Sequence, residues 1–100
     1  MKKYDLPPLR EVIRRHGLNP RKSLGQHFIL DPNLTNRITR TAGELEGYNV
    51  IEIGPGPGGL TRALLDSAAK SVVVVEKDPR CLAILKDLQK LSGRRLQIIN

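Results

Sequence analysis

Two acidic residues and a glycine-rich stretch have the types and spacing needed to hold a small ligand. The stretch "VIEIGPGPGG" (residues 50–59) places Glu52 two residues before its first glycine. Its glycines, beginning with Gly54 and Gly56, satisfy the pattern G-x-G-x-x-G, in which the missing side chains let a ligand approach the backbone. Glu76 ends a later apolar run, "SVVVVE". A carboxylate at that place accepts hydrogen bonds from both hydroxyls of a ribose, so the pattern predicts an adenosine-containing ligand.

The acid and the prolines of this stretch argue against a dinucleotide. Glu52 beside a pyrophosphate would be repelled, whereas it is favourable beside a cationic ligand or as an anchor for loop amides. Pro55 and Pro57 lack the backbone N–H groups that a phosphate cradle requires. The stretch also lacks the Gly-Lys-Ser/Thr sequence of a P-loop. We therefore expect a cationic ligand without phosphate, although Glu76 is compatible with either ligand.

These residues must be positioned by strands that alternate with helices, the pattern of half a doubly wound α/β sheet. Crossovers between parallel strands have one hand, so three strands can be laid side by side. Such a half-sheet leaves one edge open and one face thinly covered, and we expect the chain to be a piece of a longer one. The expected strands are 48–53, 71–76 and 94–100. The expected helices are 7–17, 31–43, 59–69 and 79–91. We expect residues 1–7 to be a flexible end and residues 18–30 to be a loop or extended arm.

Two of the expected helices have clear start signals. Asp31 and Asp78 are each followed by proline, which predicts an aspartate N-cap with proline in the first turn. Leu34, Ile38 and Ala42 recur at every fourth residue and predict the buried face of the helix over 31–43.

The positive charge is concentrated in the N-terminal part of the chain. Residues 1–40 hold nine lysines and arginines against three acids, whereas residues 41–100 hold eight against seven. This asymmetry favours a polyanionic partner such as nucleic acid, although a solvated basic surface has the same composition. No apolar run reaches the roughly 20 residues of a membrane span. The single cysteine, Cys81, allows no internal disulfide, and together with two histidines it makes a structural zinc site improbable.

Three motifs resemble those of known methyltransferases. The order E-x-G-x-G-x-G, beginning at Glu52, resembles motif I of the S-adenosylmethionine-dependent methyltransferases, whose ligand carries a sulfonium cation and no phosphate. Upstream, "KSLGQHFILD" (residues 22–31) resembles the N-terminal signature of the ribosomal RNA adenine N6-dimethyltransferases. Together with "EIGPGPGGLTRALL" and "VVVVEKD", it makes residues 6–100 similar to the small-subunit, 16S rRNA group of that family.

The resemblance implies a Rossmann-like methyltransferase fold and the N6,N6-dimethylation of adenines in 16S rRNA during assembly of the small ribosomal subunit. S-adenosylmethionine would be the cofactor, in contact with Gln26, His27, Ile29, Glu52, Gly54, Gly56 and Glu76. His27 stands where asparagine is commoner, and both side chains offer a hydrogen-bonding group. The basic residues implied to contact rRNA are Arg10, Arg14, Arg15, Arg21 and Lys22. The family's catalytic Asn-[Leu/Ile]-Pro-[Tyr/Phe] motif is expected beyond Asn100, so these residues alone are expected to be inactive.

We expect two regions: residues 1–30 as a basic helix and arm that closes over the cofactor, and residues 31–100 as the first half of the methyltransferase domain. We also expect a cytoplasmic monomer without metal or membrane contact. The alternatives are a 23S rRNA methyltransferase of the macrolide-resistance type and a non-catalytic nucleic-acid-binding relative. An NAD(P)-dependent oxidoreductase is the least favoured.

Overall fold

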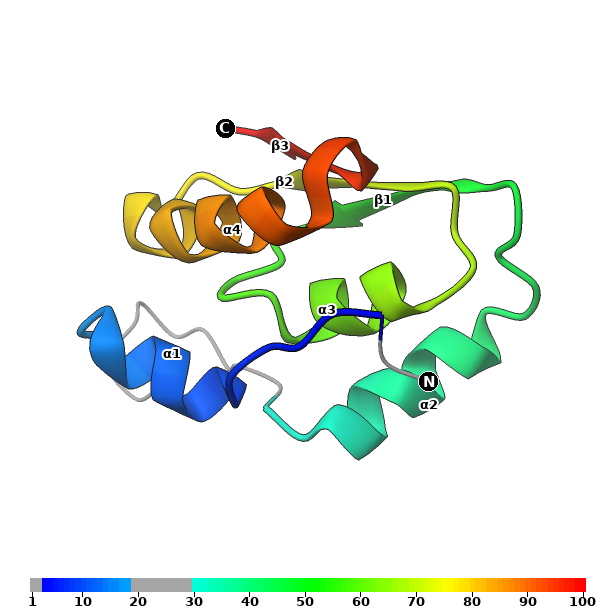
Figure 1. Ribbon diagram of the computed structural model, residues 1–100. Helices are drawn as coiled ribbons and strands as arrows, with labels where there is room; N and C mark the ends of the chain where they lie inside the picture. Colours follow the sequence, from blue (N-terminus) through cyan, green and yellow to red (C-terminus); the bar gives the residue numbers. More distant parts are fainter. Residues whose placement is uncertain (1–2, 19–29) are drawn as a thin grey trace.

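A parallel sheet with helices on one side forms the centre of the molecule. A computed structural model describes residues 3–18 and 30–100. The three strands pair in the order β1-β2-β3, all parallel. The expected alternation of strands and helices is therefore confirmed. Along the chain the elements are α1 (Leu9–Arg15), α2 (Pro32–Thr41), β1 (Asn49–Ile53), α3 (Gly59–Asp66), β2 (Ser71–Val75), α4 (Pro79–Ser92), the 3-10 helix η1 (Gly93–Arg95) and β3 (Leu96–Ile99), as Figure 1 shows.

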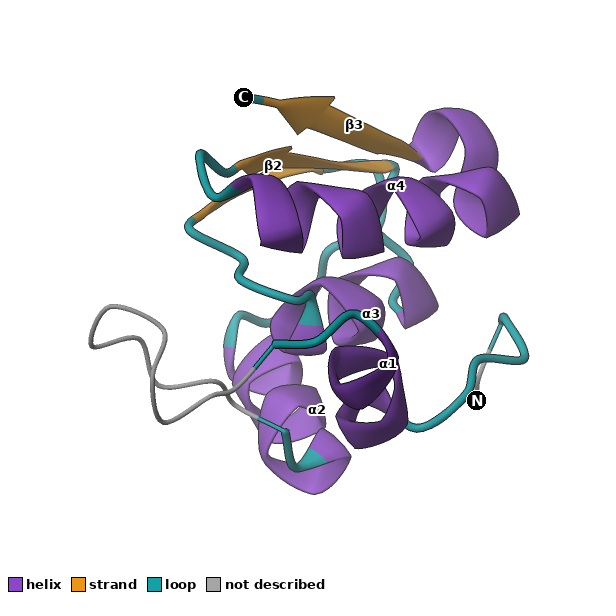
Figure 2. Cartoon of the chain, turned by 90° about the vertical axis from the view of Figure 1, so that its left-hand side faces the viewer, coloured by secondary structure: helices purple, strands orange, loops and turns teal. Residues whose placement is uncertain are grey.

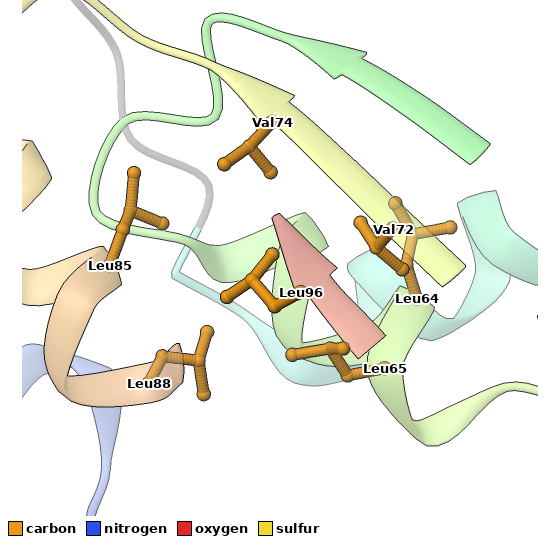
Figure 3. Close-up of a cluster of buried hydrophobic side chains, with 7 residues drawn as sticks. All are labelled: Leu64, Leu65, Val72, Val74, Leu85, Leu88 and Leu96. Atoms are coloured by element: carbon orange, nitrogen blue, oxygen red, sulfur yellow. The ribbon is translucent and has the colours of Figure 1, made fainter. Parts of the chain in front are cut away.

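The main core lies between the sheet and the two helices that connect its strands. Because both crossovers run in the same direction across the sheet, α3 and α4 lie on the same face of it, as Figures 1 and 2 show. The side chains that fill this core come from α3, β2, α4 and β3 and are buried. They are Leu64, Leu65, Val72, Val74, Leu85, Leu88 and Leu96 (Figure 3).

The opposite face of the sheet is bare among the described residues. Side chains alternate between the faces of a strand, so the register Ile51↔Val73 and Ile53↔Val75 places these four on the face away from α3 and α4. Ile51 and Ile53 are 67% and 74% exposed, and Ile99 of β3 is 51% exposed. The open face expected from a half-sheet is confirmed.

A second, smaller core holds α1 against α4. Leu9, Val12 and Ile13 form the buried face of α1, as their helical spacing predicts. They pack with Leu18 and with two buried side chains of α4, Cys81 and Ile84. Burial of the Cys81 thiol raises its pKa to about 11, since the thiolate would lose its hydration there.

The segment before α1 is held in place, so the prediction of a flexible end is wrong for residues 3–7. Tyr4 and Leu6 pack against the main core. The backbone N–H of Lys3 donates to Asp66 Oδ1 at 2.9 Å, and Arg62 Nη1 donates to the Pro7 carbonyl oxygen at 2.6 Å. The sequence could not predict these contacts, because they join residues about sixty positions apart.

One arginine connects this N-terminal segment to the end of α3. Arg95 Nη1 donates to the Tyr4 hydroxyl oxygen at 2.8 Å and to the Leu65 carbonyl oxygen at 2.7 Å. Its Nη2 donates to the carbonyl oxygens of Ser67 and Ala69 at 3.3 and 3.0 Å. The guanidinium therefore covers carbonyl groups that a helix leaves without partners at its C-terminal end. The helix ends at Asp66 rather than at residue 69 because Ser67 is extended, with φ −77° and ψ 179°.

Helix α2 begins as predicted but buries a different face. Asp31 is its N-cap, and the Asp31 carboxylate accepts a hydrogen bond from the Asn33 N–H at 2.9 Å. The side chains buried on α2 are Thr35 and Thr39, whereas Leu34 and Ile38 are 43% and 38% exposed. The prediction that Leu34 and Ile38 form the buried face is therefore wrong. Among the helices of residues 3–18 and 30–100, none has the length and apolar character needed to cross a membrane.

Candidate functional site

The glycine loop and both predicted acids meet at the carboxyl edge of the sheet. Ile53 pairs with Val75 at the ends of β1 and β2, so Gly54 and Glu76 leave the sheet side by side. The Gly54 N–H donates to the Val75 carbonyl oxygen at 2.9 Å. Gly54 has a positive φ of 67°. A Cβ added at Gly54 would meet no atom within 4 Å, so the missing side chain leaves open space at this edge.

Glu76 is the buried acid of the site, with 5% of its surface exposed. Its Oε1 accepts a hydrogen bond from the Gly56 N–H at 2.9 Å. Its Oε2 accepts from the N–H groups of Lys77 and Asp78, both at 3.0 Å. A carboxylate has about four acceptor positions, so three main-chain donors leave room for another. Glu76 thus fixes the glycine loop and keeps acceptor capacity for a ligand.

Glu52 is half-buried and has a different partner. Thr61 Oγ1, on the first turn of α3, donates to Glu52 Oε1 at 2.6 Å. Burial is the main cause that raises the pKa of Glu52, because the ionised carboxylate loses water. The hydrogen bond from Thr61 opposes this shift, and the negative charge of Glu76 adds to it. Two carboxylates therefore adjoin the loop, and that of Glu52 is poorly compensated.

The loop enters α3 through Gly58, which is the N-cap of the helix. Its φ of 98° and ψ of 26° are left-handed, a conformation that residues other than glycine rarely adopt. A Cβ added here would lie 3.3 Å from Leu85 Cδ2 of α4. Gly58 thus lets the loop turn sharply where its backbone approaches Leu85 and Leu88 of α4.

Asp78 caps α4, as its position before proline predicts. Its Oδ1 accepts the Arg80 N–H at 2.9 Å, and the Arg80 guanidinium donates to both carboxylate oxygens. The hydrogen bond from the Arg80 side chain is the main cause that lowers the pKa of Asp78.

The predicted basic residues divide between described and undescribed parts of the chain. Arg10, Arg14 and Arg15 lie on the exposed side of α1. Arg14 and Arg15 form ion pairs with Glu11, with N···O distances of 3.9 and 3.6 Å. The remaining predicted site residues, Arg21, Lys22, Gln26, His27 and Ile29, lie outside the described residues.

Some residues of the site were missed by sequence reasoning. Thr61 follows the loop by one turn, a position from which its hydroxyl reaches Glu52, and that spacing was the available signal. The amides of Lys77 and Asp78 carry no side-chain signal, since every residue except proline supplies a backbone N–H. In the described ranges, no cluster of three or more histidine, cysteine or acidic side chains is arranged to hold a metal ion.

A glycine loop after the first of three parallel strands and a buried acid after the second define a class of protein. This arrangement is the Rossmann-like fold of the S-adenosylmethionine-dependent methyltransferases. The crystal structure of the 23S rRNA methyltransferase ErmE is 42% identical, covering 74% of this chain and 30% of its own, with a TM-score of 0.59. The N-terminal domain of EvdMO1, solved with SAH bound, covers 91% of this chain and 45% of its own at a TM-score of 0.59. At 20% identity, that second likeness shows the fold alone.

The family follows from the sequence comparisons. The family model for ribosomal RNA adenine dimethylase matches residues 17–100. The ribosomal RNA small subunit methyltransferase A of Paramagnetospirillum magneticum is 61% identical over 95 residues, which are 95% of this chain and 34% of that protein. Its counterpart in Rhodopseudomonas palustris is 62% identical over 96 residues. This chain belongs to the ribosomal RNA adenine dimethylase family, and it spans about a third of the length of these curated relatives.

Proposed function

We propose that the protein is an S-adenosylmethionine-dependent enzyme that dimethylates N6 of adenines in 16S rRNA during assembly of the small ribosomal subunit. The observation that carries the proposal is a buried acid, Glu76, bonded to the glycine loop in a chain whose relatives are small-subunit methyltransferases. These residues form its cofactor-binding part. We propose that it is a cytoplasmic monomer.

The residues of the site fit this cofactor. Glu76 has remaining capacity to accept hydrogen bonds from ribose hydroxyls, and Gly54 leaves open space beside it. Pro55 and Pro57 offer no N–H to a phosphate. The ionised form of Glu52 is disfavoured by burial and by the charge of Glu76. A cationic ligand beside the two carboxylates would offset this cost by electrostatic attraction. When bound, S-adenosylmethionine would supply the methyl group.

The chain's own contribution is to bind and orient. Glu76 holds Gly56 and thereby fixes the loop before a ligand arrives, which lowers the entropy lost on binding. We propose that Gln26, His27 and Ile29 complete the cofactor site from the arm. We also propose that the arm and α1 bind rRNA phosphates through Arg10, Arg14, Arg15, Arg21 and Lys22. Catalysis that mainly aligns two bound substrates depends on such positioning.

The test of the cofactor uses the full-length protein with Glu76 replaced. Glu76→Gln removes one acceptor oxygen and the negative charge. We expect the Kd for S-adenosylmethionine to rise at least about tenfold, because a hydrogen bond to a charged group contributes roughly 1.5–3 kcal/mol. Isothermal titration calorimetry measures this Kd. Glu46→Gln is the matched control, since Glu46 is exposed and its side chain makes no hydrogen bond to a described residue. Tighter binding of NAD than of S-adenosylmethionine would overturn the proposal in favour of an oxidoreductase.

A second measurement concerns the substrate. Transfer of a labelled methyl group to adenine should occur in small-subunit particles and not in 23S rRNA. The identity to ErmE makes the 23S rRNA methyltransferases the second candidate, and transfer to 23S rRNA alone would favour them. RNA binding without any methyl transfer would favour a non-catalytic relative.

A further inference from the structure

Helix α2 presents two arginines without any acid to compensate them. All ten acids of the chain lie within residues 3–18 and 30–100, and none occurs between Asp31 and Glu44. Asp31 is engaged in capping α2, and Glu44 accepts the Glu46 N–H. In the described ranges, no carboxylate oxygen lies within 4.0 Å of a side-chain nitrogen of Arg37 or Arg40. Both arginines are exposed.

The arginines of α1 differ in this respect. Arg14 and Arg15 share Glu11, so part of their charge is already compensated. Arg10, on the first turn of α1, has no such partner among the described acids. Among the described residues of α1 and α2, the cations without a carboxylate oxygen within 4.0 Å are therefore Arg10, Arg37 and Arg40.

A cavity lies between Arg10 and helix α2, and Arg62 and Asp66 also line it. Arg10 and Asn36 both line this cavity of about 460 Å³, which also has Pro32 and Thr35 in its wall. The first turn of α1 is therefore next to the N-terminal half of α2. Arg40 follows Asn36 by four residues and so lies on the same side of the helix, one turn further on.

The orientation of α2 keeps its arginines away from the core. Thr35 and Thr39 are buried, and each hydroxyl donates to a carbonyl oxygen of α2 itself, at 3.1 and 3.0 Å. Their methyl groups can therefore face α3 without an unpaired polar atom. Arg37 follows Thr35 by two residues, about 200° around the helix, which places it on the side turned away from α3. Figures 1 and 2 show α2 on the far side of α3 from the sheet.

We propose that this basic face of α2, formed by Arg37 and Arg40, binds the phosphate backbone of the RNA substrate together with Arg10. The planar guanidinium donates two parallel hydrogen bonds to a phosphate, and its charge releases the counterions of the RNA. Because the contact is to phosphates, it positions the RNA and does not read its bases. The proposal rests on the proposed function, because it takes rRNA as the partner.

The test measures the salt dependence of RNA binding by the full-length protein. Fluorescence anisotropy gives the Kd of a 16S rRNA fragment at several salt concentrations for wild type, Arg37→Gln/Arg40→Gln and Arg37→Lys/Arg40→Lys. Loss of two phosphate contacts should reduce the slope of log K against log salt by about 1.4–1.8 and raise Kd at 0.15 M salt by roughly tenfold. The lysine variant keeps both charges and should keep the slope. The control Lys86→Gln/Arg94→Gln removes the same charge from exposed positions of α4 and η1 and should change the slope by less.

The outcomes separate this inference from the function on which it rests. If the wild-type protein neither binds nor methylates rRNA, the proposed function and the inference both fail. If the wild type does both and the glutamine variant keeps its slope, only the inference fails. An equal loss of slope in the Lys86/Arg94 control would also overturn it, because the effect would then report net charge alone. Circular dichroism confirms that each variant is folded.

Discussion

Glu52 and Glu76 lie at the ends of neighbouring strands, but their carboxylates have different hydrogen-bond donors and different roles. Glu76 accepts three main-chain N–H groups and so holds the loop. Glu52 has Thr61 as its hydrogen-bond donor and a pKa raised chiefly by burial. The sequence predicted that both acids would gather beside the glycines, because parallel strands end at one edge. It offered the anchoring of loop amides as one of two roles for Glu52, whereas the Gly56 amide bonds to Glu76, because the path of the loop cannot be read from spacing.

The raised pKa of Glu52 predicts a dependence of stability on pH. The folded state binds this proton more tightly than the unfolded chain does. The stabilisation is therefore fully present below the ordinary pKa of 4.5 and is lost as pH rises through the raised value. Glu52→Gln keeps an acceptor oxygen for Thr61 and removes the charge. We expect its free energy of unfolding to fall less than that of the wild type between pH 4.5 and neutrality.

Urea unfolding at a series of pH values measures this difference. Glu46→Gln, an exposed acid on the loop before β1, is the control and should follow the wild-type profile. Superimposable profiles for the wild type and Glu52→Gln would show that burial does not disfavour the ionised carboxylate.

At the scale of elements, helix positions were predicted better than helix faces. Asp31 and Asp78 began α2 and α4 as expected, because N-capping is local chemistry. The buried face of α2 was predicted wrongly, since a period of apolar residues takes no account of threonine. Thr35 and Thr39 satisfy their hydroxyls within the helix and can be buried, which leaves Leu34 and Ile38 on the flank.

The junction of loop, α3 and α4 predicts a large effect at Gly58. Gly58→Ala adds a Cβ in a left-handed conformation, which costs about 1–2 kcal/mol. The new Cβ also lies 3.3 Å from Leu85 Cδ2, so the Leu85 side chain must move by a few tenths of an ångström. We expect a loss of at least about 2 kcal/mol in the free energy of unfolding. Urea denaturation of the full-length protein measures it.

Gly43→Ala is the matched control for Gly58. Gly43 also has a positive φ, 88°, but a Cβ there would meet nothing within 4 Å. The free energy of unfolding of Gly43→Ala should therefore fall only by the cost of placing alanine in a left-handed conformation. Equal losses in the two variants would mean that the close approach of Gly58 to Leu85 contributes nothing.

At the scale of the whole molecule, contacts between distant residues were invisible to the sequence. The predicted flexible end is instead held by Arg95, ninety-one positions from Tyr4. An arginine in a turn carries no pattern that names its partners. The order of strands could be predicted, because the direction and hand of crossovers follow from the chain's own geometry.

Arg95 should therefore contribute more to the free energy of unfolding than a typical arginine near the surface does. Arg95→Ala leaves the Leu65, Ser67 and Ala69 carbonyl oxygens without this donor. We expect the free energy of unfolding to fall by about 2–4 kcal/mol, since each lost hydrogen bond to a charged group contributes roughly 1.5–3 kcal/mol and water replaces part of it. Thermal denaturation measures the change.

Its neighbour Arg94 provides the control. Arg94 is exposed, and Arg94→Ala should change stability by no more than about 0.5 kcal/mol. Similar losses at both positions would indicate a general effect of charge in η1 and not the hydrogen bonds of Arg95.

The bare face of the sheet matters for how such a protein is made. In the described residues, Ile51, Ile53 and Ile99 face water together. Among the described residues no strand pairs with the outer edge of β1, so the apolar face adjoins a row of unpaired backbone groups. This combination attracts other extended chains. We therefore expect these residues, when produced by themselves, to aggregate.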